Sequence, residues 1–317
     1  MATAKLKTKF NLGERRRKVV AFVLLTVISV LCELPLLWAF GTSFKKNALT
    51  DITSIIPKEF SFDNYIQLFS NKDAPVFRWM LNSVFISGIH TVLYLIIAAL
   101  AGFAFGVAEW KGRNVVFGLL LATALIPNII NLVPLYKLIT SMELNGNPLA
   151  LILPGLGGVL YMMLIRQYFM SVPKELVEAA QLEGAGMFRI FLRIEVPLCK
   201  SAFMVVAMMT FIGSWNDYLW PSIAMAGVES KYLTLPLGIA KLLGDNNIQY
   251  GMTMAGAVTS MLPTLIVYLF LQILLLVPKE KRSWPLTIII SVVAPLAIYG
   301  LFTYLISSPL PKGLWGY

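Results

Sequence analysis

The sequence contains several apolar runs longer than 20 residues, and the first of them extends from about Val19 to Phe44. A helix of about 20 apolar residues is long enough to cross the hydrocarbon core of a bilayer. A secretory signal peptide also follows a basic segment, but its apolar core is only roughly 7–15 residues long. The first run therefore predicts a transmembrane helix preceded by a basic head, residues 1–18.

Later apolar runs predict further spans, and the composition agrees with them. We expect about seven spans, at about 19–44, 84–105, 116–138, 148–169, 202–226, 255–277 and 286–306. Only 13% of the residues are charged, whereas about a quarter are charged in a soluble domain. A soluble enzyme is therefore excluded. Pro127, Pro134 and Pro154 are expected to kink or break their helices, because proline removes a helical hydrogen bond.

The basic residues predict the orientation of these spans. With the N-terminus in the cytoplasm, roughly 17 of the 26 lysines and arginines fall on the cytoplasmic side and roughly nine outside. This bias has the sign of the positive-inside rule. It also accounts for the net charge of +10 without nucleic acid, since the charges border apolar runs. We expect a multi-pass cell-membrane protein with residues 171–200 in the cytoplasm.

The loop at residues 171–200 is short, polar and rich in small residues. Pro173 and Glu175 mark a helix start, since proline suits the first turn and a carboxylate suits the positive end of the helix dipole. The expected helix then carries Ala179, Ala180, Gly184 and Ala185, and Ala180 and Gly184, four apart, share one face. A face of small residues lets another surface approach closely. The alternative is an ordinary amphipathic connector on the membrane surface.

Several motifs resemble those of permeases from binding-protein-dependent ABC importers, in particular the maltose-type (carbohydrate uptake 1) family. The loop Glu178-Ala-Ala-Gln-Leu-Glu183-Gly-Ala, closed by Pro197, resembles the "EAA" loop. The segment from Phe211 to Pro221 resembles the fifth-helix signature. The remaining similar motifs are Asn82-Ser83, Val133-Pro-Leu-Tyr136, Leu233-Thr-Leu-Pro236, Met254-Ala-Gly-Ala257 and Leu262-Pro-Thr264. The resemblance covers about Ala21 to Leu275.

This resemblance implies an all-α integral membrane fold with the six-helix core of a type I ABC importer. The chain departs from the family in one extra C-terminal hydrophobic segment, which we expect to be a further transmembrane helix. The expected parts are a cytoplasmic head at 1–18, a first transmembrane helix at 19–44, an external loop at 45–79, a permease core at 80–277 and a basic loop with the extra segment at 278–317. A span over 285–306 is favoured, and a re-entrant or surface segment stays open because of Pro285 and Pro295.

The resemblance also implies how the chain is driven. The segment from Glu175 to Gly186 would be a coupling helix seated in a cleft of a cytoplasmic ATPase. ATP-driven closure of the ATPase pair would switch the bundle between inward- and outward-facing states. The implied coupling residues are Glu178, Ala179, Ala180, Glu183, Gly184, Ala185 and Pro197. Glu183 departs from the family, which usually has aspartate there. The implied partners are a second permease subunit, two ATPase subunits, an extracytoplasmic solute-binding protein and a sugar. A heterodimer of permeases is favoured, and a homodimer stays open.

The sequence offers no chemistry of its own. It lacks the Gly-x4-Gly-Lys-Ser/Thr phosphate loop, so ATP and Mg²⁺ would be used by the partner ATPase, and we expect no cofactor or metal on this chain. Cys32 and Cys199 fit neither a metal site nor a disulfide framework. His90 is expected to be a packed or hydrogen-bonded core residue. An integral-membrane enzyme would need His or carboxylate groups gathered at one depth, and no such set is evident.

Trp215, Asn216, Asp217 and Tyr218 interrupt the fifth expected span. Aromatic faces with a few placed polar groups suit a sugar path, but a helix break near the outer interface would show the same residues. Both interpretations stay open. Oligosaccharides are the expected substrates, with monosaccharides, polyols and glycerol phosphate esters open. The alternative function is an ion-coupled secondary transporter, for which Glu33 and Asp217 are the candidate residues within spans.

Overall fold

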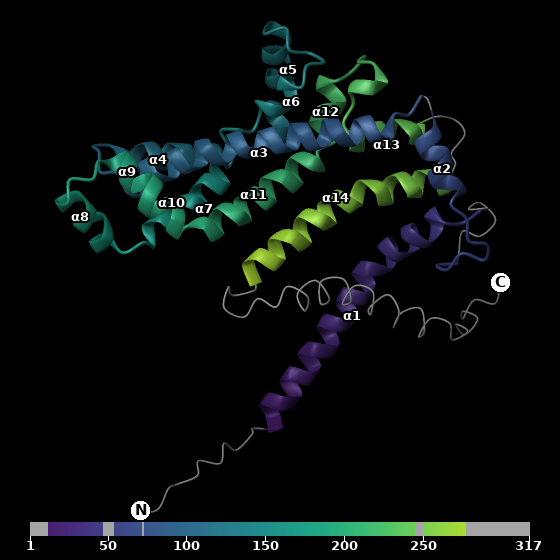
Figure 1. The fold of residues 1–317 in the computed structure, drawn as a ribbon, viewed down its shortest axis with the longest axis horizontal. Helices are drawn as coiled ribbons and strands as arrows, with labels where there is room; N and C mark the ends of the chain where they lie inside the picture. The colour runs from purple at the N-terminus through teal and green to yellow at the C-terminus, as the bar shows by residue number, and fades with distance from the viewer. Residues whose placement is uncertain (1–11, 47–53, 72, 245–249, 277–317) are drawn as a thin grey trace, which may run out of the picture.

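The computed structural model describes residues 12–46, 54–71, 73–244 and 250–276, and these residues form a bundle of helices (Figure 1). The elements are α1 (Leu12–Ser43), α2 (Asp63–Ser70), α3 (Val76–Gly106), α4 (Arg113–Thr123), η1 (Asn128–Asn131), α5 (Leu132–Ser141), α6 (Leu149–Ile152), α7 (Val159–Met170), α8 (Lys174–Leu182), α9 (Met187–Ile190), η2 (Phe191–Glu195), α10 (Val196–Leu198), α11 (Lys200–Trp215), α12 (Leu219–Ala224), η3 (Ser230–Tyr232), α13 (Leu235–Gly244) and α14 (Tyr250–Leu276).

The bundle is organised around α3, which packs chiefly against α7 and α11. Small residues make the contact with α7 close. A Cβ on Gly102 would lie 3.0 Å from Cγ2 of Ile165, and one on Gly106 would lie 3.3 Å from the backbone oxygen of Arg166. Small residues spaced four apart are typical of closely packed membrane helices. Gly102 and Gly106 therefore allow α7 to approach α3 more closely than larger residues would.

Two hydrophobic clusters lie at different levels of α3. One includes Trp79 and Ile86, and the other includes Ala98 and Phe103. In Figure 1 the loop helix α8 is at one end of the bundle and α2 is at the other. The expected external loop and the expected cytoplasmic loop thus place their helices, α2 and α8, at opposite ends.

At the end of the bundle near α2, the start of α3 is bonded to the segment before α13. Nδ2 of Asn82 donates to the carbonyl of Leu233 at 2.9 Å, and the amide of Leu235 donates to Oγ of Ser83 at 2.8 Å. The indole of Trp79 donates to the carbonyl of Ser230 at 2.6 Å and lies against Gly238. Two motifs about 150 residues apart in sequence thus meet in space.

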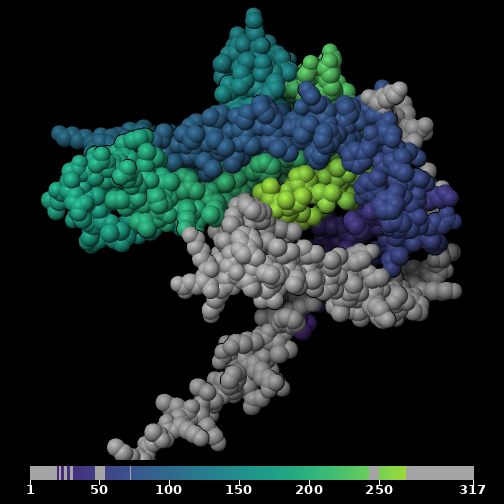
Figure 2. Space-filling model, in the orientation of Figure 1, coloured from purple at the N-terminus to yellow at the C-terminus, as the bar shows by residue number. Residues whose placement is uncertain are grey.

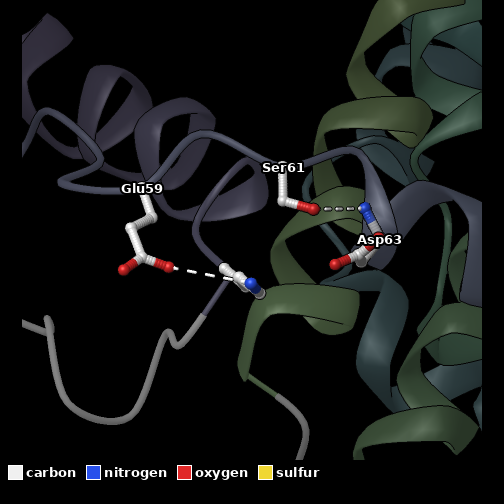
Figure 3. A network of polar contacts seen from close by, with 4 residues as sticks. Glu59, Ser61 and Asp63 are labelled. Carbon is white, nitrogen blue, oxygen red and sulfur yellow. Dashed lines mark hydrogen bonds and ion pairs between the residues drawn. The ribbon is translucent and has the colours of Figure 1, made fainter.

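The segment between α1 and α2 has several polar contacts, and Figure 3 shows two of them. Oγ of Ser61 accepts a hydrogen bond from the amide of Asp63 at 2.9 Å, at the start of α2. Nζ of Lys46 lies 3.9 Å from Glu59, and both side chains are exposed, so this ion pair adds little stability. Helix α2 is amphipathic: it buries Leu68 and exposes Ile66.

Two helices among the described residues, Val76–Gly106 and Tyr250–Tyr268, are long and apolar enough to cross a membrane. The number of such spans rises to four if each of two bent helix pairs counts as one span. The bent pairs are Arg113–Thr123 with Asn128–Ser141, at 84°, and Met187–Leu198 with Lys200–Trp215, at 78°. The span count stays a prediction. Figure 2 shows the segment with α5 and α6, in teal, projecting from the side of the bundle beside α12, in green.

The structure corrects several expected boundaries. Helix α3 begins at Val76, so the external loop ends before Trp79, and α1 begins at Leu12 within the basic head. Breaks follow Thr123 and Ile152, near Pro127 and Pro154 as expected. Pro134 does not break its helix, because it falls in the first turn of α5, where no amide is needed. The expected segment 285–306 lies outside the described residues.

Candidate functional site

Helix α8 begins where the sequence predicted a helix start. Pro173 is its N-cap residue, and Glu175 places a carboxylate in the first turn. The helix ends at Leu182, four residues before the expected end at Gly186. Ala185 is therefore not part of it, and Ala180 and Gly184 do not share a helical face. That expectation was wrong because of what Gly184 does to the backbone.

Gly184 closes α8 in a left-handed conformation with φ of +82°. The amide of Ala185 donates to the carbonyl of Ala180, and the amide of Gly184 donates to the carbonyl of Gln181, both at 2.9 Å. This pair of bonds is a Schellman motif, in which glycine adopts the positive φ at no steric cost. The glycine of the loop motif thus terminates the helix and turns the chain back toward the bundle.

Helix α8 has a packed side and an open side. Val177, Ala180 and Ala185 are partly buried against the hydrophobic cluster that includes Phe103 and Phe169. On the open side Leu182 is 90% exposed, and a Cβ on Gly184 would meet no atom within 4 Å. Glu178, Ala179 and Glu183 are also exposed. We call this open side of α8, with Ala179, Leu182 and Gly184, the knob. An exposed apolar surface flanked by charges is the kind of surface that another protein covers.

Short helices connect this knob to α11. Ile190 and Phe191 are buried in the same cluster as Phe103, so the segment after α8 is firmly packed. Pro197 lies in the first turn of α10, and the chain then bends by 78° into α11. Helix α8 is thus connected through short segments to α7 and α11, and a displacement of the knob would act on both helices.

Glu195 lies on the π-helical turn η2 in this connection, ahead of α11. It is 1% exposed, and its Oε2 has no hydrogen-bond partner among the described residues. Burial raises the pKa of the Glu195 carboxyl to about 7, because a low-dielectric environment disfavours the charged form. Sequence reasoning missed this residue, and its only signal is a carboxylate between Ile194 and Val196.

The four residues that interrupt the fifth span have separate environments. Helix α11 ends at Trp215 and α12 begins at Leu219, so the expected interruption is present. Trp215 is buried, and its indole donates to the carbonyl of Ser260 at 3.1 Å; it packs inside the bundle. Asn216 is exposed, and Tyr218 is 49% exposed. Asp217 is half-buried, and its Oδ1 accepts a hydrogen bond from the amide of Trp220 at 3.4 Å.

His90 contacts the backbone of a neighbouring helix, and its expected role as a hydrogen-bonded residue of the bundle is confirmed. Its Nδ1 lies 2.8 Å from the carbonyl oxygen of Ile152. Asp217 interacts electrostatically with the same imidazole, which no sequence pattern indicated. Within the described residues, no three or more His, Cys, Asp or Glu side chains are grouped in a way that could hold a metal ion.

Comparison with known proteins gives a consistent result. Residues 95–277 match the family described as "Binding-protein-dependent transport system inner membrane component". The arabinooligosaccharides transport system permease protein of Bacillus subtilis is 36% identical over 218 residues, which are 69% of this chain and 76% of that protein. The galactooligosaccharides transport system permease protein of the same organism is 33% identical over 260 residues, 81% of this chain and 91% of that protein.

A solved structure has the same fold. It is described as a bacterial ABC transporter involved in the import of the acidic polysaccharide alginate. One of its chains superposes with a TM-score of 0.73 at 22% identity, covering 83% of this chain and 98% of that chain. At that identity the match shows the fold alone.

Proposed function

This chain belongs to the family of binding-protein-dependent transport system inner membrane components, and we propose that it forms half of the path for an oligosaccharide through an importer driven by a separate ATPase. One observation supports coupling to that ATPase: the exposed knob at α8. The knob lies within the loop motif, and Gly184 fixes where its helix ends. The chain is a transmembrane permease subunit of an ABC importer.

The proposed substrate class rests on the named relatives. The most similar of those described above transport arabinooligosaccharides and galactooligosaccharides by name, and a lactose transport system permease protein of Rhizobium radiobacter is 30% identical over 268 residues. These sugars differ in composition, but each has more than one sugar unit. A short oligosaccharide is therefore the substrate that we propose.

The coupling mechanism follows from the two sides of α8. The exposed Leu182, Ala179 and Gly184 would fit a cleft in a cytoplasmic ATPase. ATP and Mg²⁺ would be bound by that partner. Closure of two ATPase copies would displace α8, and the packed Ile190 and Phe191 would pass the displacement to the bundle, because packed cores do not deform continuously.

The projecting segment supports a second permease subunit as a partner. Leu125, Ile130 and Val133 are 83%, 62% and 65% exposed, and the backbone at residues 124–127 is irregular between the arms of a bent pair. Irregular backbone at membrane depth is tolerated only where protein or a water-filled cavity covers it. A partner permease, in a heterodimer, would supply that cover.

The proposed solute-binding protein would meet the end of the bundle opposite α8. A second solved transporter with this fold, at a TM-score of 0.62 and 17% identity, is described in complex with a periplasmic protein that carries an alginate pentasaccharide. For this chain we propose a cytoplasmic N-terminus and a cytoplasmic α8, on the basis of the positive-inside bias, so that α2 lies on the outer side.

Reconstitution tests this proposal directly. The chain would be purified with its co-expressed partner permease, ATPase and binding protein and placed in proteoliposomes. We expect uptake of arabinotriose or lactose that needs ATP and Mg²⁺ and the binding protein. Uptake that continues without ATP and follows an imposed proton or sodium gradient would instead establish an ion-coupled secondary transporter.

A further inference from the structure

Two helix breaks and the middle of α3 meet at one place, which we call the polar junction (His90, Ala150, Ile152, Asp217 and Trp220). Helix α6 ends at Ile152, and the gap between α11 and α12 contains Asp217. The indole of Trp220 donates to the carbonyl of Ala150 at 2.8 Å, and His90 lies 2.8 Å from the carbonyl of Ile152. Side chains from two other elements thus bind the carbonyls that the end of α6 leaves free.

The hydrogen bond fixes which nitrogen of His90 carries a proton. A carbonyl oxygen only accepts, so Nδ1 is the donor to Ile152. In the neutral imidazole Nε2 is then an acceptor. Gly155, with φ of +85°, lies beside this edge of the ring, where an added Cβ would be 3.5 Å from Cε1. The contact with α6 therefore uses Nδ1 of His90 and leaves Nε2 as an acceptor.

Asp217 has acceptor capacity to spare as well. Its carboxylate accepts hydrogen bonds from the backbone of Trp220, at 3.4 Å, and of Leu219, while a carboxylate can accept about four. The Asp217 carboxylate and the His90 ring interact electrostatically. An ionisable side chain within a membrane span is costly and is commonly found on a substrate pathway.

An aromatic surface adjoins these acceptors. The rings of His90 and Tyr94 have centroids 6.2 Å apart, and Tyr94 packs edge-on against Tyr161 at 5.9 Å. The hydroxyl of Tyr94 donates to the carbonyl of Gly158, which leaves Tyr161, only partly buried, as the more open ring. Sugars present hydroxyl donors at their edges and C–H groups on their faces, so acceptors beside an aromatic ring match both.

We propose that His90 and Asp217 accept hydrogen bonds from hydroxyl groups of the transported sugar, and that this subunit therefore contributes a sugar contact of its own to the path. The inference rests on the proposed function. Discontinuous helices whose breaks meet within the membrane are where transporters commonly place their substrate sites. Here the breaks at α6 and at Asp217 converge on His90.

The test uses variants that keep the local structure. Asp217→Asn retains an oxygen for the amide of Trp220 and loses the charge, and His90→Gln retains a donor for Ile152. Ser222→Ala is the matched control, since Ser222 lies on α12 and, within the described part of the chain, its hydroxyl donates to Leu219 of its own helix. The readout is sugar moved per ATP hydrolysed by the reconstituted complex with its binding protein, measured with the sugar that the wild type transports best.

We expect each variant to lower this ratio at least fivefold, with ATP hydrolysis stimulated by the binding protein retained within twofold and the control unchanged. A ratio equal to that of the wild type would overturn the proposal, as would a fall in assembly and ATP hydrolysis that leaves the ratio unaltered. If the variants do not assemble, photolabelling of the wild-type complex with a diazirine-bearing sugar replaces this measurement. Labelling of the peptides that contain His90 or Asp217 would support the contact, and labelling confined to other peptides would reject it. A wild type without ATP-dependent uptake would refute the proposed function itself.

Discussion

The amide of Ala185 donates to the carbonyl of Ala180 at 2.9 Å, and this bond fixes where α8 ends. It exists because Gly184 between them adopts φ of +82°. The loop motif is therefore a helix with a defined stop. Its small residues have two roles, since Ala180 packs inward while Gly184 turns the chain.

Replacing Gly184 by valine should disrupt this stop. A β-branched residue in the left-handed region costs about 1–2 kcal/mol or more, and the chain after α8 would have to change direction. We expect ATP hydrolysis to continue while sugar uptake falls severalfold, measured in proteoliposomes. Gly186→Ala is the control, because Gly186 has an ordinary φ of −70° and open space around it. Equal uptake by both variants would contradict this role of Gly184.

Glu195 should make the stability of the bundle depend on pH. Burial raises the pKa of its carboxyl to about 7, so the folded state holds the proton more tightly than the unfolded state does. Stability must then fall as pH rises from the ordinary carboxyl range through about 7, and it levels off above that. The midpoint of thermal unfolding of the purified complex should drop between pH 5 and pH 8.

The variant Glu195→Gln removes this titration, so its unfolding midpoint should depend less on pH than that of the wild type. Glu183→Gln removes the same charge from an exposed position and should keep the wild-type profile. Identical pH profiles for the wild type and Glu195→Gln would show that the carboxyl is hydrated or paired in the assembled transporter.

The contact between α3 and α7 should be intolerant of larger residues. Gly106→Leu would force atoms into the backbone of Arg166, where even a Cβ lies at 3.3 Å, and overpacking of this kind costs about 1–3 kcal/mol. We expect a lower yield of assembled complex and a lower midpoint of thermal unfolding. Gly118→Ala, on α4 with no atom within 4 Å of the added Cβ, should be neutral or slightly stabilising. Equal losses for both variants would contradict the packing argument.

The membrane class, the polar loop and the break in the fifth span were predictable from the sequence because each has a local cause. Long apolar runs need lipid, Pro173 and Glu175 start a helix, and α11 ends at Trp215 as expected. The motif Asn82-Ser83 was recognised, and so was Leu233-Thr-Leu-Pro236. Their hydrogen bonds to one another depend on the three-dimensional fold, which no local pattern encodes.

What could not be predicted depends on conformation or on long-range neighbours. The spacing of Ala180 and Gly184 suggested one helical face, but a positive φ at Gly184 ends the helix first. Trp215 and Asp217 are two residues apart in one motif, yet Trp215 is buried against α14 and Asp217 interacts electrostatically with His90. The burial of Glu195 depends on how η2 packs, which its sequence neighbours do not reveal.

The docking of α8 on an ATPase is the central claim, and cross-linking from its open side tests it most directly. A photoreactive amino acid would replace Ala179, which is exposed, in the complex purified with its native partners, and Ile66 on α2 at the other end would be the control site. The account predicts a cross-link from position 179 to the ATPase that changes in yield when ATP is added, and none from position 66. A complex in which position 179 reaches no ATPase, or in which position 66 does, would contradict it.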